Sequence, residues 1–278
     1  GIEKTAKGFT FHTKGGDFYA TKCIMATGGK TLRKSGSDGS GFLYLESLGH
    51  HIIDLVPGLI GLKGKQSFFA DIAGIRADAK VDLYIESTHV CSERGELQLT
   101  NYGISGIPVF QLSRVAARAL SEQKKVYATL NFVPFWEKEQ CLTYFKERFK
   151  KADEKHIGEA LIGFFPEKLI PVLLEESHIK AAKYANRLQT EELERFIDTV
   201  QGLRVDITDW NTFDTAQVTA GGVDTDEIDA ETMESKLCPG LYFAGEMVDI
   251  DGICGGYNLQ WAWSSGAVAG IHVARELS

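Results

Sequence analysis

The fold is decided by one stretch near the end of the chain, Gly240-Leu-Tyr-Phe-Ala-Gly-Glu-Met-Val-Asp249, which continues as Asp251-Gly-Ile-Cys-Gly-Gly-Tyr-Asn-Leu-Gln-Trp-Ala-Trp263. Residues 241–244 form a short apolar run with aromatic β-formers, which predicts a buried strand. A glycine-rich turn follows, and small or apolar residues then recur at helical spacing from Asn258 to Ala269. A strand, a turn and a helix in this order indicate part of an α/β sheet.

The turn between this strand and this helix is a candidate binding site. Gly245 has no Cβ, so the backbone can approach a ligand closely there. Glu246 and Asp249 place carboxylates just past the carboxyl end of the strand, where open α/β sheets bind ligands. Gly255 and Gly256 lead into a helix whose free N–H groups and positive dipole end face the turn. The first residues of that helix complete the candidate site: Tyr257, Asn258 and Leu259.

A second candidate segment lies near the start of the chain. An alternating stretch around the turn Lys14-Gly-Gly-Asp17 predicts a β-hairpin. Its second arm runs into Lys22-Cys-Ile-Met-Ala-Thr-Gly-Gly29, which we expect to be a buried strand. Thr27 can donate a hydroxyl hydrogen bond, while Gly28 and Gly29 permit close backbone approach.

Both segments end in glycines suited to one ligand site, so we expect residues 20–29 and 240–246 to be strands of the same sheet. Together they resemble the FAD-binding segments of two-dinucleotide-fold flavoproteins. With Gln217-Val-Thr-Ala-Gly-Gly-Val-Asp224, the C-terminal part is more narrowly similar to the aminoacetone oxidase family of bacterial NAD(P)/FAD-dependent oxidoreductases.

This resemblance implies a function. FAD would be the cofactor and would carry the redox chemistry, with NAD(P) as a possible electron partner. The substrate would be a small molecule, such as an amine or a small carbonyl compound. The Gly245–Glu246 pair would meet the ribityl-phosphate part of FAD, and the helix N-terminus at residues 257–259 would face the flavin pyrimidine ring. No catalytic side chain is predicted.

The middle of the chain predicts two insertions into a partial Rossmann-like FAD-binding domain. That domain would comprise residues 1–55 and 206–278, in an α/β (α+β overall) fold. Residues 56–135 contain short apolar runs of period two, which predict an antiparallel β-rich subdomain, such as a small barrel. Residues 136–205 carry apolar residues at helical spacing and predict a helical subdomain.

A complete protein of the family that this sequence resembles should begin with a strand and a G-x-G-x-x-G turn. No segment of this sequence matches that pattern. We therefore expect an N-terminally truncated chain that binds FAD weakly or not at all. The inserted portions should fold regardless. An exposed sheet edge could pair with a second copy and form a homodimer.

Composition restricts the partners. The 278 residues are 44% hydrophobic and 24% charged, with a net charge of −8, so nucleic acid and anionic membranes are poor candidates. No apolar run is long enough for a membrane span, and the first residues do not form a signal peptide. Five cysteines without a CxxC pair fit a cytoplasmic setting. His50-His51 has no metal-ligand spacing, so no metal site is predicted.

Two alternative interpretations stay open. A flavin-dependent tRNA-modifying protein would share the FAD segments, but it would need a basic surface that a net charge of −8 does not favour. A non-enzymatic FAD-binding or interaction module would use residues 136–205 as a docking face, and a large exposed apolar patch there would favour it.

Overall fold

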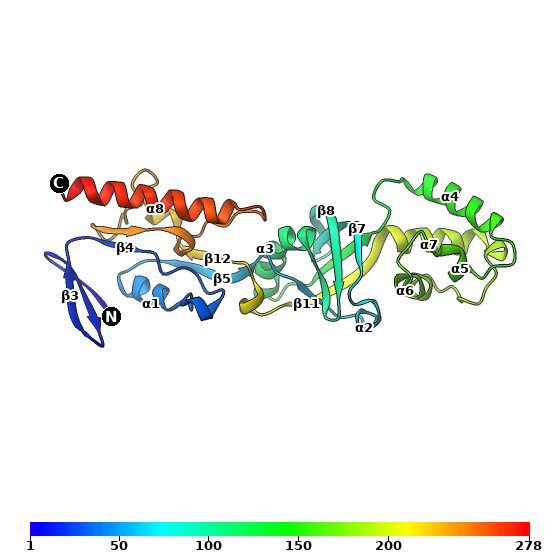
Figure 1. The fold of residues 1–278 in the computed structure, drawn as a ribbon, viewed down its shortest axis with the longest axis horizontal. Helices are drawn as coiled ribbons and strands as arrows, with labels where there is room; N and C mark the ends of the chain where they lie inside the picture. Colours follow the sequence, from blue (N-terminus) through cyan, green and yellow to red (C-terminus); the bar gives the residue numbers. More distant parts are fainter. The chain divides into compact units, whose positions relative to one another are not determined.

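Figure 1 shows the computed structural model, which describes residues 1–278. The chain divides into two compact units. We call the discontinuous one, made of Gly1–Ile60 and Asn211–Ser278, the split unit, and the continuous one, Gly61–Trp210, the barrel unit. Helices and strands occur in both, which confirms the predicted mixed α/β fold class.

The split unit contains short strands, two longer helices and several 3-10 turns. Its strands are β1 (Ile2–Thr5), β2 (Gly8–Thr13), β3 (Gly16–Ala20), β4 (Cys23–Met25), β5 (Ile52–Gly58), β12 (Val218–Val223) and β13 (Leu241–Phe243). Its helices are α1 (Ser40–Ser47) and α8 (Tyr257–Glu276), and its 3-10 turns are η1 (Arg33–Ser35), η3 (Phe213–Thr215), η4 (Thr225–Glu227) and η5 (Gly245–Met247). Strands β1, β2 and β3 form an antiparallel meander that includes the predicted hairpin.

Strands β4 and β13 pair in parallel, with Leu241 opposite Cys23 and Phe243 opposite Met25. This confirms that the two glycine-ended segments share a sheet although more than 200 residues separate them. The first strand is shorter than expected, because β4 covers only Cys23–Met25 and the residues from 26 to 29 lie outside the ladder. The carboxyl ends of both strands therefore lie on one edge, the place where open parallel sheets bind ligands.

Strands β5 and β12 form a second, antiparallel pair whose register shifts between Ala220 and Gly222. At the bulge, the Gly221 N–H donates to the Asp249 carboxylate at 3.0 Å. The Asp249 N–H in turn donates to the Val223 carbonyl at 3.0 Å. These bonds attach the segment after η5 to β12 and fix the end of the candidate site.

Helix α8 begins at Tyr257, directly after the two glycines, where the sequence predicts it. Only Ser265 and Ala269 of this helix are buried. Near its end the Glu276 carboxylate accepts a hydrogen bond from the Tyr242 hydroxyl at 2.8 Å and pairs with Lys22. The helix is thus attached to both strands of the parallel pair, because Tyr242 belongs to β13 and Lys22 precedes β4.

The barrel unit is built on a closed six-stranded barrel with the strand order β10-β11-β6-β9-β8-β7. Its strands are β6 (Leu62–Gly64), β7 (Arg76–Ile85), β8 (Thr88–Thr100), β9 (Gly103–Gly106), β10 (Val126–Asn131) and β11 (Leu203–Trp210). Every pairing in it is antiparallel, as the period-two pattern predicts. Closure leaves this sheet without an open edge.

Helices complete the barrel unit, and Figure 1 shows α4 to α7 gathered at one end of it. The helices are α2 (Phe69–Ile72), α3 (Ile107–Ser121), α4 (Lys138–Lys151), α5 (Ile157–Leu161), α6 (Leu169–Glu176) and α7 (Thr190–Gly202). Pro108 lies in the first turn of α3, after the cap Gly106. Gln189 caps α7. One continuous apolar core joins the barrel and helices α4 to α7.

None of the helices in the structure is both long and apolar enough to cross a membrane. Of the two adjacent histidines, His50 is buried and His51 is exposed. His50 Nδ1 lies 2.8 Å from a Glu227 carboxylate oxygen, and its Nε2 lies 3.0 Å from the Ser235 hydroxyl. His50 therefore has a structural role in the split unit, and the structure contains no group of three or more potential metal ligands.

Candidate functional site

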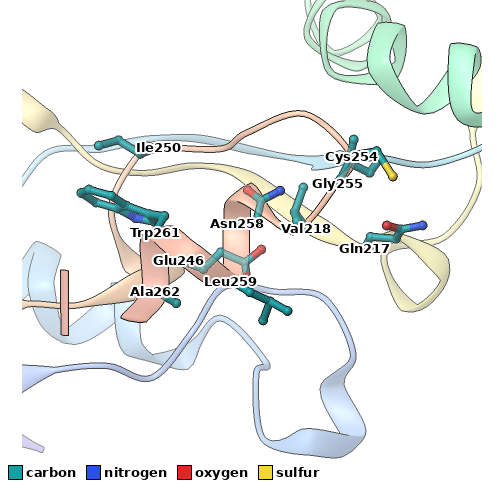
Figure 2. Close-up of a pocket in the computed structure, with 12 residues that line it drawn as sticks. Gln217, Val218, Glu246, Ile250, Cys254, Gly255, Asn258, Leu259, Trp261 and Ala262 are labelled. Carbon is teal, nitrogen blue, oxygen red and sulfur yellow. The ribbon is translucent and has the colours of Figure 1, made fainter. Parts of the chain in front are cut away.

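A pocket of about 410 Å³ lies at the carboxyl end of β13, within the split unit (Figure 2). Apolar side chains form most of its wall, and a few polar groups interrupt them. The lining residues are Leu59, Gln217, Val218, Glu246, Ile250, Cys254, Gly255, Gly256, Asn258, Leu259, Trp261 and Ala262. A largely apolar cavity with few convergent polar groups is the usual form of a cofactor or small-molecule site. We call it the ring pocket.

Glu246 is the acidic side chain of the ring pocket, and it is only partly exposed. Its carboxylate accepts the Thr219 N–H of β12, and a backbone hydrogen bond from Gly29 also reaches it. Burial raises the pKa of Glu246 above its ordinary value, against the opposing effect of these hydrogen bonds. The carboxylate therefore joins three segments of the split unit while it faces the cavity.

Thr219 is the second member of this junction, and it is almost fully buried. Its hydroxyl oxygen accepts the Lys30 N–H at 2.7 Å. Gly29 packs so closely against it that a Cβ at position 29 would lie 2.3 Å from Thr219 Oγ1 and 3.0 Å from the Glu246 carboxyl carbon. Close packing to its neighbours in the protein, rather than space for a ligand, therefore requires glycine at position 29.

The opposite side of the ring pocket is the loop that leads into α8. Asn258 closes this loop, since its amide oxygen accepts the Gly252 N–H at 2.8 Å and its amide nitrogen donates to the Gly252 carbonyl at 3.0 Å. Gly256 caps the helix with a φ of +93°, and a Cβ there would meet no atom within 4 Å. The cap thus combines a backbone conformation that favours glycine with open space beside the first turn of the helix.

Trp261 forms one end of the ring pocket beside Ile250, whereas Cys254 and Gln217 lie at the other end (Figure 2). The indole Nε1–H donates to the Gly245 carbonyl at 3.0 Å. The Gly245 N–H donates to the Ser265 hydroxyl at 2.9 Å. Both backbone groups of Gly245 are therefore held by α8, which fixes the turn that carries Glu246.

The predicted site residues separate into two groups. Five of them line the ring pocket: Glu246, Gly255, Gly256, Asn258 and Leu259. The other six are not among its lining residues: Thr27, Gly28, Gly29, Gly245, Asp249 and Tyr257. Among these, the Thr27 hydroxyl donates to the Met247 sulfur at 2.9 Å. The buried Ser37 hydroxyl has no partner and lies where a Cβ on Gly28 would come within 2.9 Å of it.

Sequence reasoning missed several residues of the ring pocket. Leu59 and Val218 come from β5 and β12 or their ends, and only the fold brings them to the carboxyl end of β13. Gln217 and Val218 lie in the quoted Gln217–Asp224 motif, so that motif was the available signal. Trp261 lies within the opening stretch, where its helical spacing suggested only packing.

Comparison with known proteins identifies the family of this chain. The family model described as "HI0933-like protein Rossmann domain" matches residues 1–272. The chain belongs to the HI0933-like family. This is a coarser assignment than the aminoacetone oxidase family, which the comparisons do not confirm.

This HI0933-like chain spans about two thirds or less of the length of the named relatives that it matches. It is 44% identical over 269 residues to the 3-dehydro-bile acid delta(4,6)-reductase of Clostridium scindens, covering 97% of this chain and 66% of the relative. It is 29% identical over 264 residues to the ribosomal RNA dihydrouridine synthase of Escherichia coli, with 95% and 63% covered. The corresponding enzyme of Haemophilus influenzae is 29% identical over 257 residues, with 91% and 60% covered.

The ring pocket of this HI0933-like chain suits the ring system of a flavin. Its volume of about 410 Å³ fits a tricyclic ring, although it is small for a whole dinucleotide. The open space at Gly256 leaves the first turn of α8 accessible to the ring edge. Glu246 offers carboxylate oxygens as acceptors for hydroxyl groups of a ribityl chain.

Proposed function

We propose that this chain forms the flavin-ring site of an FAD-dependent reductase that acts on a carbon–carbon double bond in an apolar, polycyclic ketone. The observation that carries the proposal is the ring pocket itself, with its apolar wall, its open helix N-terminus at Gly256 and the Glu246 carboxylate on one side. The family supports the cofactor, and the 44% identical relative supports the reaction and the substrate class.

FAD, when bound, supplies hydride transfer between an NAD(P)H donor and the substrate. The residues of the chain bind and orient it. Glu246, fixed by Thr219 and Gly29, accepts hydrogen bonds from ribityl hydroxyl groups. The free N–H groups at the start of α8, beside Gly256, stabilise negative charge on the nearest edge of the ring.

The apolar residues of the ring pocket have a separate task. Val218, Ala262 and the Trp261 indole enclose the ring and keep water from it. Leu259 lines the pocket and is 60% exposed, so it is available to contact an apolar substrate above the ring. This arrangement favours reduction of an apolar ring substrate over oxidation of a small amine such as aminoacetone.

The relatives also include enzymes whose name specifies ribosomal RNA, so RNA is a second possible substrate class. Charge does not favour it. The split unit has 9 lysines and arginines against 16 acidic residues, and the barrel unit has 21 against 22. A protein that holds RNA through its phosphates needs a basic surface, which neither composition predicts.

The test follows the ultraviolet absorbance of candidate substrates during turnover. The purified chain is mixed with excess FAD and NADH or NADPH without oxygen, and a 3-oxo-4,6-diene steroid is added. We expect the ultraviolet absorbance of the conjugated ketone to fall and that of uridine-containing RNA to stay constant. Consumption of RNA but not of the steroid would replace the proposed substrate, and no flavin binding at all would overturn the proposed cofactor site.

A further inference from the structure

We propose that the split unit contains a second ligand site, adjacent to the ring pocket, for a small neutral molecule that has one ring and one hydroxyl group. A cavity of about 240 Å³ lies between α8 and the segment that includes η4 and Met233. We call it the side pocket. Its own binding does not depend on the proposed function, whereas its coupling to the ring pocket rests on that function.

The floor of the side pocket is apolar. Ile228, Met233 and Val248 are each at most 5% exposed and line it. No acidic or basic side chain is among its lining residues. A charged ligand would lose hydration there without gaining a partner, whereas an apolar ring would gain from leaving water. The occupant is therefore neutral.

Hydroxyl groups lie at the rim. Thr225 and Ser264 are exposed and line the side pocket. The Ser264 oxygen accepts a hydrogen bond from the Gln260 side chain at 2.9 Å, and its own proton remains available to an acceptor. A ligand hydroxyl at the rim can accept that proton, while the rest of the ligand fills the apolar floor.

The volume limits the size of the ligand. About 240 Å³ is the space of roughly eight water molecules in the liquid, which one six-membered ring with a short substituent fills. A fused four-ring molecule would not fit. The ligand of the side pocket therefore differs from the polycyclic substrate proposed for the ring pocket.

The two pockets share a wall. Trp261 and Ile250 line both of them, and Figure 2 shows the two side chains together at one end of the ring pocket. The Trp261 indole also donates to the Gly245 carbonyl, next to Glu246. A ligand packed against the indole from the side pocket would hold it in this position. Occupation of the side pocket should therefore strengthen flavin binding, and by linkage a flavin should strengthen binding of the ligand.

The binding test uses 4-fluorobenzyl alcohol as the neutral probe and 4-fluorobenzoate as its anionic counterpart, both followed by fluorine NMR. We expect the chain to broaden the signal of the alcohol and not that of the benzoate. Ala230 is exposed and lines the side pocket, so Ala230→Phe should fill the cavity without unfolding the protein. The matched variant Ala230→Ser should leave it open and keep the broadening.

Two results would overturn the second site: the signal of the alcohol does not broaden with the unchanged chain, or it broadens equally with Ala230→Phe. A third would do so as well: the broadening is lost with Gly256→Val alone, which would place the alcohol in the ring pocket. The coupling is tested by titrating FAD with and without the alcohol, where we expect about fivefold tighter binding of FAD in its presence. That effect should vanish in Ala230→Phe. If FAD does not bind at all, the proposed function fails while the fluorine result stands. An unchanged FAD affinity would overturn the coupling alone.

Discussion

The two units of this chain are stabilised in different ways. The barrel unit has one continuous core of 41 buried apolar residues, whereas the main core of the split unit has 15. The split unit instead contains 20 of the 29 glycines. Its segments are joined by hydrogen bonds from backbone N–H groups to single side chains such as Glu246, Thr219 and Asp249.

This difference assigns stability mainly to the core of the barrel unit and ligand binding mainly to the polar contacts of the split unit. A closed barrel with a large core tolerates loss of any one polar contact, because its free energy of folding comes mainly from apolar burial. A site made of close backbone contacts depends on individual atoms, because each buried donor needs its own acceptor. We therefore expect core substitutions to affect stability most, and substitutions around the ring pocket to affect flavin binding most.

The largest effect on stability is expected for Phe196→Ala in the barrel unit. Phe196 is fully buried. Its ring packs edge-to-face against that of Phe145, with the two ring centroids 5.5 Å apart. Removing it should cost about 3–5 kcal/mol of the free energy of unfolding, because a cavity remains. Denaturant unfolding combined with hydrogen exchange would locate the loss in the barrel unit. Flavin affinity should stay unchanged at temperatures where the variant is folded, and a parallel loss of affinity would contradict the separation.

The next effect is expected for Gly29→Ala in the split unit. The added methyl group would lie 2.3 Å from Thr219 Oγ1, so β12 or the turn after β4 must move, at a cost of about 1–3 kcal/mol. This movement should also weaken flavin binding. The matched control is Gly270→Ala in α8, where a Cβ meets no atom within 4 Å and stability should rise by about 0.5–1 kcal/mol. Equal behaviour of the two variants would refute this account of Gly29.

A smaller effect is expected for Thr219→Val. Valine keeps the shape of the side chain but removes the acceptor of the Lys30 N–H. An unsatisfied buried donor should cost about 1–2 kcal/mol. Thr219→Ser keeps the hydroxyl and should recover most of that loss. Thermal unfolding of both variants measures the difference, and a serine variant as unstable as the valine variant would show that packing, not the hydrogen bond, matters.

The sequence predicted β4 and β13 as strands and the start of α8, because these elements follow from local features, and it predicted one shared sheet for the two strands from their glycine ends. A strand that ends in glycines and a glycine pair before a helical pattern are visible within about ten residues. The antiparallel barrel followed from period-two runs in the same way. These elements were predictable because short-range physics determines them.

The network around Glu246 could not be predicted in this way. The bond between the Lys30 N–H and Thr219 joins residues 189 positions apart, and no spacing rule indicates it. Thr27 illustrates the same limit, because its hydroxyl donates to Met247, 220 positions away. Side-chain direction at a long-range junction depends on the packed fold, so sequence alone identified the segments of the site but not their internal partners.

The smallest effect is expected for Glu246→Gln, and it concerns pH. Burial raises the pKa of Glu246 above its ordinary value of 4.5, so the folded state holds this proton more tightly than the unfolded state. Stability should therefore fall as pH rises from about 4.5 through the raised folded pKa. Glutamine cannot ionise, so the variant should lose this part of the pH dependence. Denaturant unfolding between pH 4 and 7 would show it, and an unchanged slope would argue against a buried, protonatable Glu246.

The claim that the ring pocket holds a flavin is tested most directly by titrating the chain with riboflavin and with FAD, followed by flavin fluorescence. We expect both to bind weakly and with affinities within about tenfold of each other, because the pocket would contact the ring and the ribityl chain while no segment of the sequence matches the pyrophosphate-binding turn. Gly256→Val should abolish binding. Its matched control is Gly74→Val in the barrel unit, where φ is +90° and a Cβ also meets no atom, and this variant should bind both ligands normally. Absence of riboflavin binding, or equal loss in the two variants, would contradict the flavin assignment.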